Sequence, residues 1–186
     1  DRQGHRRGLG RAAATGGDVM IENVVPSHLQ PVIAKLREAG ATVEEYDDKI
    51  RVMARDTIKS LDIKTLPYPG FPTDMQAQFM AMLSKADGTS IINETIFENR
   101  FMHVNELSRM GLNVKVEGSS AVLKGSSPLS GAKVRATDLR AGAALIIAGL
   151  LAEGETEITE VYHIRRGYAN IVEKLRGLGA DIKYEE

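Results

Sequence analysis

Apolar and polar positions follow a pattern that recurs along the chain, alternating between helical and strand spacing. KLREAGA at residues 35–41 and KLRGLGA at 174–180 agree at five of seven positions. Apolar residues spaced three and four apart predict amphipathic helices at Leu29, Val32, Ile33 and Leu36, and at Ile171, Val172, Leu175 and Leu178. Glycines close these helices and a third one, which predicts left-handed C-caps at Gly40, Gly111 and Gly179.

A strand pattern begins just after a glycine in each copy of this unit. The glycines are Gly17, Gly88 and Gly154, and an isoleucine follows four residues later in each case, at Ile21, Ile92 and Ile158. Two stretches with polar turns, 42–54 and 113–125, are predicted to be β-hairpins that follow the helices.

A second helix is predicted upstream of the glycine in two of the copies. Residues 73–88 and 137–154 both open with Thr-Asp, and short strand patterns at 63–69 and 132–136 precede them. The unit therefore has the order βαβαββ and recurs about three times, over residues 1–60, 61–130 and 131–186. We expect one α/β domain over residues 1–186, with pseudo-threefold symmetry and small, Ala-rich helices inside.

The first copy departs from the pattern. The repeat aligns Asp1 with Asp74 and Asp138, but residues 3–11 read QGHRRGLGR where the other copies are mostly small and apolar. Such a basic, glycine-rich segment does not suit a buried helix. It is either a basic phosphate-binding loop or, as we favour, a frayed terminus or an altered stretch of sequence.

The composition is that of an ordinary soluble protein, with 42% apolar and 26% charged residues and a net charge of -1. This charge gives no reason to expect nucleic acid or an anionic membrane as a partner. The chain has no cysteine, which excludes a disulfide or thiolate metal site within it. Its longest apolar run, at 141–152, is too short to span a bilayer, and no signal peptide is evident, so a cytoplasmic location is expected.

The start of the helix at FPTDMQAQFMAML (71–83) carries a candidate functional carboxylate. Thr73 is predicted to cap the helix, with Gln76 completing a capping box, and Asp74 lies in the first turn, where the helix dipole favours an acid. The residues themselves leave two alternatives open: Asp74 holds the helix end, or it takes part in chemistry.

Four segments together resemble the UDP-N-acetylglucosamine enolpyruvyl transferases, relatives of the shikimate-pathway transferases. They are FPTDMQAQ (71–78), NETIFENRFMHVNELSRMG (93–111), ATDLRAGAAL (136–145) and YHIRRGY (162–168), and the resemblance extends from Ala12 to about Ile182. It implies an inside-out α/β barrel-like domain of three βαβαββ units, one of the family's two domains. The family's Lys-Asn pair and its mobile Cys- or Asp-bearing loop have no match here, so the chain resembles the C-terminal part only. Asp1-Arg2 begins a family pattern from which QGHRRGLGR departs.

The resemblance implies transfer of enolpyruvyl from phosphoenolpyruvate to the 3-hydroxyl of UDP-N-acetylglucosamine, with release of phosphate. This is addition and then elimination through a tetrahedral intermediate, in the first committed step of peptidoglycan synthesis. No metal or organic cofactor is implied, and the missing N-terminal domain is the expected partner. Two alternatives stay open: a non-catalytic fragment or scaffold module of the same fold, and a shikimate-type transferase, against which the ETIFENRFMHV block argues.

The resemblance also assigns site residues. It implies catalytic roles for Asp74, Arg166 and Asp138, Asp74 being the base that takes the proton of the attacking hydroxyl. It implies substrate contacts for Asp74, Ile96, Thr73, Glu98, Arg100, Leu139 and Arg140. Each has a plainer interpretation: Asp138 as a helix cap, Ile96 as a strand core residue, and Glu98 with Arg100 as an exposed ion pair on one strand face. Arg165 is expected to be solvated, and His163, at the end of a strand, is expected to be structural; no histidine has metal-ligand partners at suitable spacing.

Overall fold

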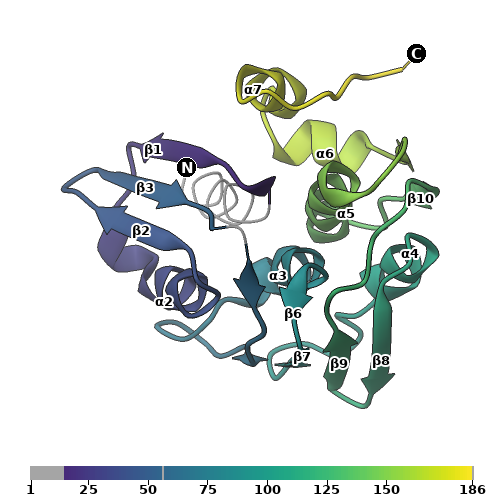
Figure 1. Ribbon diagram of the computed structural model, residues 1–186, viewed down its shortest axis with the longest axis horizontal. Coiled ribbons are helices and arrows are strands. Elements are labelled where there is room, and N and C mark those ends of the chain that lie inside the picture. The colour runs from purple at the N-terminus through teal and green to yellow at the C-terminus, as the bar shows by residue number, and fades with distance from the viewer. Residues whose placement is uncertain (1–14, 56, 186) are drawn as a thin grey trace.

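The computed structural model describes residues 15–55 and 57–185 (Figure 1). The predictions for Asp1 and for the basic segment at residues 3–11 lie outside the described residues. Helices and strands alternate along the chain, as the α/β class requires. The described strands form four separate sheets rather than one closed barrel.

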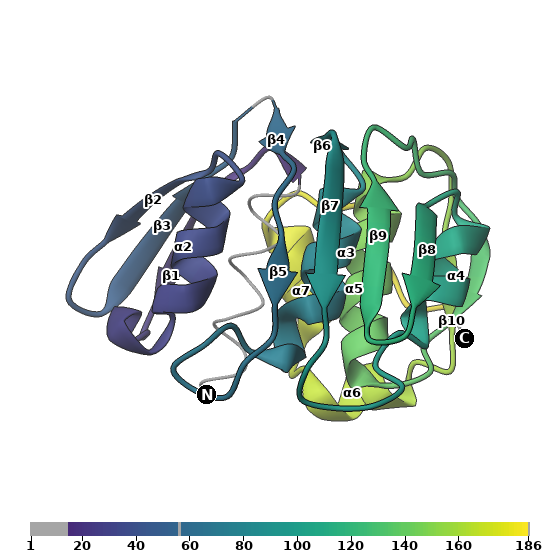
Figure 2. The ribbon, with the colours of Figure 1, turned by 90° about the horizontal axis from the view of Figure 1, so that it is seen from below.

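Two apolar helices occupy the centre of the molecule. α3 (Gln76–Leu83) and α5 (Leu139–Leu151) lie side by side (Figure 1), and the four-stranded sheet covers them on one side (Figure 2). Every residue of α3 is buried, as is the stretch 141–148 of α5. Because alanine and glycine dominate this part of α5, its backbone can approach its neighbours closely. A methyl group added at Gly142 would come within 2.6 Å of Ile164 Cγ1.

The first copy of the repeat forms a three-stranded antiparallel sheet with a helix on one face. The order is β1 (Asp18–Glu22), β3 (Lys49–Met53) and β2 (Thr42–Glu45), with Ile21 opposite Ile50. α2 (Gln30–Glu38) lies over this sheet (Figure 2) and buries Val32, Ile33 and Leu36, as its spacing predicts.

The second copy contributes the larger sheet. Its order is β5 (Ile63–Lys64), β7 (Thr89–Asn93), β9 (Ser120–Lys124) and β8 (Asn113–Glu117), and α4 (His103–Arg109) lies between β7 and β8 in the chain. β4 (Ile58–Lys59) pairs in parallel with β6 (Ala86–Asp87). In the third copy, β10 (Lys133–Arg135) and β11 (Glu157–Thr159) are parallel neighbours, followed by α6 (Tyr162–Gly167) and α7 (Ile171–Gly177).

One helix in each copy, α2, α4 or α7, ends in the same way. Gly40, Gly111 and Gly179 have φ angles of 101°, 99° and 88°, which confirms the predicted left-handed caps. The amide after each glycine bonds a carbonyl five residues back: Ala41 to Leu36, Leu112 to Leu107, and Ala180 to Leu175, at 3.0, 3.1 and 3.0 Å. This shared hydrogen bond is the Schellman motif, so the sequence repeat is also a structural one.

Three local predictions are wrong. β7 ends at Asn93, so Ile96 lies in a loop, while Glu98 and Arg100 lie in a turn rather than along one strand face. The YHIRRGY segment is mainly the helix α6 and not a strand end. Leu178 is 59% exposed although its spacing places it on the apolar face of α7, because that helix ends at Gly177.

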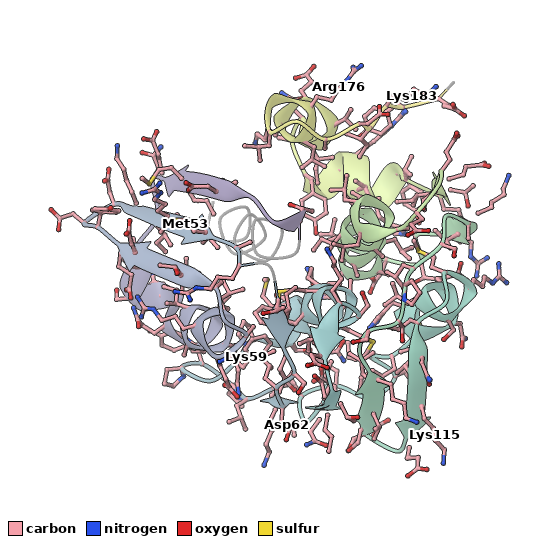
Figure 3. The ribbon with its side chains drawn as sticks, viewed as in Figure 1. Met53, Lys59, Asp62, Lys115, Arg176 and Lys183 are labelled. Carbon is pink, nitrogen blue, oxygen red and sulfur yellow. The ribbon has the colours of Figure 1, made fainter. Side chains whose placement is uncertain are left out.

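Charged side chains cover the outer surface. Lys115 on β8, Arg176 on α7 and Lys183 beyond α7 are exposed and project away from the ribbon (Figure 3). Among the described residues, no helix combines the length and the apolar character needed to cross a membrane.

Candidate functional site at the start of the two central helices

The segment that leads into α3 begins with a short 3-10 helix, η2 (Thr73–Met75), whose N-cap is Pro72. Thr73 does not cap the helix, and Gln76 does not complete a capping box, so this prediction is wrong. The Thr73 hydroxyl instead bonds Glu94 Oε2 at 2.9 Å. A carboxylate is a stronger acceptor than a neutral group, which explains why the hydroxyl is turned away from the helix backbone.

Asp74 does not cap the helix either. Arg140 Nε donates to Asp74 Oδ1 at 2.5 Å, joining the first turns of the two central helices. Both side chains are about one-third exposed, at 34% for Arg140 and 31% for Asp74, so solvent reaches the pair. Asp74 Oδ2 has no partner among the described residues and is left to accept a proton or a ligand hydroxyl.

Asp138 is the N-cap of α5. Its extended backbone and its Oδ1, which accepts from the Ala141 amide at 2.7 Å, are the geometry of a helix-capping aspartate. The capping interpretation of Asp138 is therefore confirmed. The carboxylate also faces a pocket, so capping does not use all of its capacity.

A small open pocket lies between the N-termini of α3 and α5 and the turn before α4. It holds about 310 Å³ of space, part of it open to solvent. Its lining residues are Thr73, Gln76, Ala77, Asn99, Arg100, Met102, His103, Thr137, Asp138, Arg140 and Ala141. Four residues that the sequence singles out, Thr73, Arg100, Asp138 and Arg140, thus converge here from separate segments.

The pocket contains polar atoms that the protein does not satisfy. Within residues 15–55 and 57–185, no hydrogen-bond partner is found for five buried atoms: Gln76 Nε2 and Oε1, Arg100 Nη1, His103 Nε2 and Thr137 Oγ1. Arg100 has no ion-pair partner among the described residues, so the expected pair with Glu98 is wrong; its guanidinium stacks over the Phe97 ring at 4.1 Å. Buried polar groups without partners are costly, and these point to a polar ligand or to water.

His103 is neutral at ordinary pH. Burial lowers its pKa to about 4 from the usual 6.5, and the nearby Asp138 carboxylate offsets only part of that effect. A neutral imidazole can donate or accept at Nε2 but adds no charge, so Arg100 and Arg140 supply the positive charge in the pocket wall.

Asp74 does not line this pocket but bonds Arg140, which does, and the remaining predicted residues do not line it either. Ile96 is half-buried in the loop after β7, Glu98 is exposed, and Leu139 is the half-buried first residue of α5. Arg166 is exposed on α6 and has no partner among the described residues. Its neighbour Arg165, expected to be solvated, lies over the Tyr184 ring at 4.2 Å.

Sequence reasoning missed Glu94, which is only 3% exposed. It stands immediately after β7 and receives three hydrogen bonds: from the hydroxyls of Thr65 and Thr73 at 2.8 and 2.9 Å, and from the Ile96 amide at 3.0 Å. The only available signal was an acid at the end of an apolar strand. In the part of the chain that the structure describes, no group of three or more acidic or histidine side chains could hold a metal ion.

Solved structures share this fold. The enolpyruvyl transferase NikO from Streptomyces tendae matches with a TM-score of 0.86 and 27% identity, over 96% of this chain and 42% of NikO. EPSP synthase from Acinetobacter baumannii matches with a TM-score of 0.74 over the whole chain and 43% of that protein; at 19% identity it supports the fold alone. The predicted α/β fold of enolpyruvyl transferase type is confirmed.

Sequence comparisons show to which group of enolpyruvyl transferases the chain is similar. The family model described as EPSP synthase (3-phosphoshikimate 1-carboxyvinyltransferase) matches residues 9–175. UDP-N-acetylglucosamine 1-carboxyvinyltransferase from Desulfofundulus thermocisternus is 63% identical over 92% of this chain and 70% of its own length. UDP-N-acetylglucosamine 1-carboxyvinyltransferase 1 from Caldanaerobacter subterraneus is 61% identical over 92% of this chain, which spans only 41% of that relative. The chain belongs to the EPSP synthase family and, within it, to the UDP-N-acetylglucosamine 1-carboxyvinyltransferases.

Proposed function

We propose that this chain forms one domain of an enzyme that transfers enolpyruvyl from phosphoenolpyruvate to the 3-hydroxyl of UDP-N-acetylglucosamine, releasing phosphate. The observation that carries the proposal is the pocket between the two central helices, which Arg100, Asp138 and Arg140 line, together with the bond from Arg140 to Asp74 beside it. The names of relatives at 61% and 63% identity support the same reaction. The enzyme would act in the cytoplasm, in the first committed step of peptidoglycan synthesis.

The charges in the pocket suit anionic substrates. The guanidinium of Arg100, whose Nη1 has no partner among the described residues, can donate from Nη1 to a carboxylate or phosphate oxygen. The amides at the start of α5 add the positive end of a helix dipole. Arg166, exposed on α6, is proposed to contact the phosphate of phosphoenolpyruvate, while Ile96 and Glu98 contact the nucleotide sugar, and Leu139 lies near the loop of the other domain.

Asp74 is the proposed base. As the sugar 3-hydroxyl oxygen attacks C2 of phosphoenolpyruvate, its proton passes to the carboxylate, and C3 takes a proton from a general acid, which gives a tetrahedral intermediate. A base then removes a proton from C3, the double bond forms again, and the bond between C2 and the phosphate oxygen breaks so that inorganic phosphate leaves with its electron pair. Arg140, bonded to Oδ1, fixes the orientation of the carboxylate and leaves Oδ2 for the proton. Asp138, in the same wall, is the second proposed catalytic carboxylate.

The alternative of a non-catalytic module is supported by the share of its relatives that the chain spans. Because the chain spans 41% of the Caldanaerobacter relative, it could act by itself only as a binding or scaffold module. The other portion would then supply the Lys-Asn pair and the mobile loop that the family uses. The identity to relatives of the nucleotide-sugar type disfavours a shikimate-type transferase.

The test measures phosphate release from phosphoenolpyruvate in the presence of UDP-N-acetylglucosamine. The chain is assayed by itself and joined to the portion of the Caldanaerobacter relative that it lacks, with the intact relative as the control for the assay. We expect activity only from the completed enzyme, and we expect Asp74→Asn to abolish it while Asp47→Asn, an exposed aspartate in the β2–β3 turn, does not. A folded, completed enzyme without activity would refute the proposal.

A further inference from the structure

A buried carboxylate connects the two segments that carry the proposed sugar contacts. Glu94 uses both of its oxygens: Oε2 accepts from Thr73, while Oε1 accepts from Thr65 and from the Ile96 amide. Thr73 directly precedes Asp74 on η2, and Ile96 lies in the loop after β7. A single side chain thus fixes the distance between the turn that holds Asp74 and the loop that holds Ile96.

A second set of hydrogen bonds anchors the carboxylate to the sheet. Thr65, which is fully buried, accepts from the Thr95 amide at 2.9 Å, and the Thr95 hydroxyl bonds the Thr65 carbonyl at 2.5 Å. Because the Thr65 oxygen already accepts from an amide, its own proton is free to go to Glu94. The direction of donation therefore runs from the backbone through Thr65 to the carboxylate, which acts only as an acceptor.

We propose that Glu94 is a positioning residue for binding of the nucleotide sugar. Acting through Thr73 and Ile96, it holds the Asp74 carboxylate and the Ile96 loop at the separation that the sugar requires, without touching the substrate itself. This inference rests on the proposed function. Hydrogen bonds to a buried charged group are stronger than neutral ones, so Glu94 can hold both segments with one side chain.

The variant Glu94→Gln tests this with little change of shape. The Ile96 amide can only donate, so the new amide must turn its oxygen toward Ile96 and Thr65 and its NH₂ group toward Thr73. The Thr73 hydroxyl then has to rotate from donor to acceptor, and every bond in the set loses its charge. We expect the dissociation constant for UDP-N-acetylglucosamine to rise about tenfold, as for loss of one charge-assisted bond.

A matched control separates positioning from stability. Glu106 on α4 is likewise buried, at 7% exposure, and accepts from the Arg135 amide at 2.9 Å, but it contacts neither sugar-binding segment. Glu106→Gln should lower the free energy of unfolding about as much as Glu94→Gln does. It should change the dissociation constant for UDP-N-acetylglucosamine by less than about twofold. Calorimetric titration of UDP-N-acetylglucosamine into the completed enzyme, with urea unfolding of each variant, gives both quantities.

Thr73→Val supplies a second variant that removes a single hydroxyl and retains the side-chain shape. If Glu94 acts through Thr73, each single variant weakens sugar binding, and the double variant weakens it by less than the product of the two effects. Independent, multiplying effects, or wild-type binding by folded Glu94→Gln, would overturn the inference. A wild-type completed enzyme that neither binds nor turns over the sugar would instead refute the proposed function, which keeps the two failures distinguishable.

Discussion

Asp138 is the N-cap of α5, and this structural role can be measured separately from any catalytic role. Its Oδ1 satisfies the Ala141 amide at the start of α5, the longer of the two central helices. Replacing it by alanine leaves that amide without its acceptor and removes a negative charge from the positive end of the helix dipole. The loss of the cap costs about 1 kcal/mol and the loss of the charge about 0.5 kcal/mol, so Asp138→Ala should destabilise the domain by about 1.5 kcal/mol.

Asp138→Asn separates these two contributions. Asparagine caps helices about as well as aspartate, so its side-chain oxygen should keep the bond to the Ala141 amide. Only the interaction between the charge and the helix dipole is lost, and we expect a decrease of about 0.5 kcal/mol in the free energy of unfolding. The difference of about 1 kcal/mol between the two variants therefore measures the cap itself.

Urea unfolding of this chain and of its two variants measures these differences, and the slopes of the transitions show whether the unfolded states remain comparable. Phosphate release by the completed enzyme is measured in parallel. If Asn retains stability and loses activity, the carboxylate acts in the chemistry as well as in the cap. Equal destabilisation by Asn and Ala, or a larger loss with Asn, would refute the assignment of Asp138 as a hydrogen-bonding cap.

Three further predictions concern the core and its pH dependence. Phe79 is fully buried and meets Phe71 edge to face at 5.0 Å, so Phe79→Ala should cost about 3–5 kcal/mol in urea unfolding. Gly142→Ala places a methyl group 2.6 Å from Ile164 Cγ1 and should cost about 1–3 kcal/mol, and this cost should be smaller when Gly142→Ala is made in an Ile164→Ala background, where the clash is removed. The pKa of His103 is about 4 in the fold against 6.5 unfolded, so the unfolded state binds more protons between these values. Stability should therefore fall as the pH drops from 6.5 toward 4, by at most about 3 kcal/mol, and His103→Gln should lose that part of the pH dependence.

The sequence predicted those features that depend on neighbours along the chain. The left-handed caps at Gly40, Gly111 and Gly179 follow from local backbone sterics, and all three are present. Both hairpins were predicted from alternation and polar turns, and they form β2–β3 and β8–β9 with matching registers. The copies of the unit also have similar local sequence patterns, so the repeat itself could be predicted from the sequence.

The site depends on contacts between distant segments, and these could not be predicted. The Thr73 hydroxyl was assigned to the helix backbone because nothing local indicated a better acceptor. Glu94, its actual partner, is 21 residues away, and Arg140 is 66 residues away from Asp74. Neither secondary-structure propensity nor hydrophobic periodicity indicates which acidic side chain will be buried when the sheet packs against the helices.

Thr73-Asp74 and Thr137-Asp138 occupy equivalent positions in two copies of the repeat but have different roles in the structure. A glutamate stands six residues after the leading glycine in both copies: Glu94 after Gly88 and Glu160 after Gly154. Glu94 is buried and bonds Thr73, whereas Glu160 is exposed, with a φ of 56°, and its nearest cation is Arg135 at 3.6 Å.

This difference in burial accounts for the different roles of the aspartates. With no buried carboxylate to hold it, the Thr137 hydroxyl has no hydrogen-bond partner among the described residues, and Asp138 caps its own helix. In the other copy, Glu94 holds Thr73, and the helix begins as the 3-10 turn η2 without a side-chain cap. Asp74 makes no capping bond there and instead accepts from Arg140 Nε. The repeat places the two aspartates at equivalent positions, and the burial of one glutamate accompanies the difference between them: Asp138 caps its own helix, whereas Asp74, the proposed base, bonds Arg140.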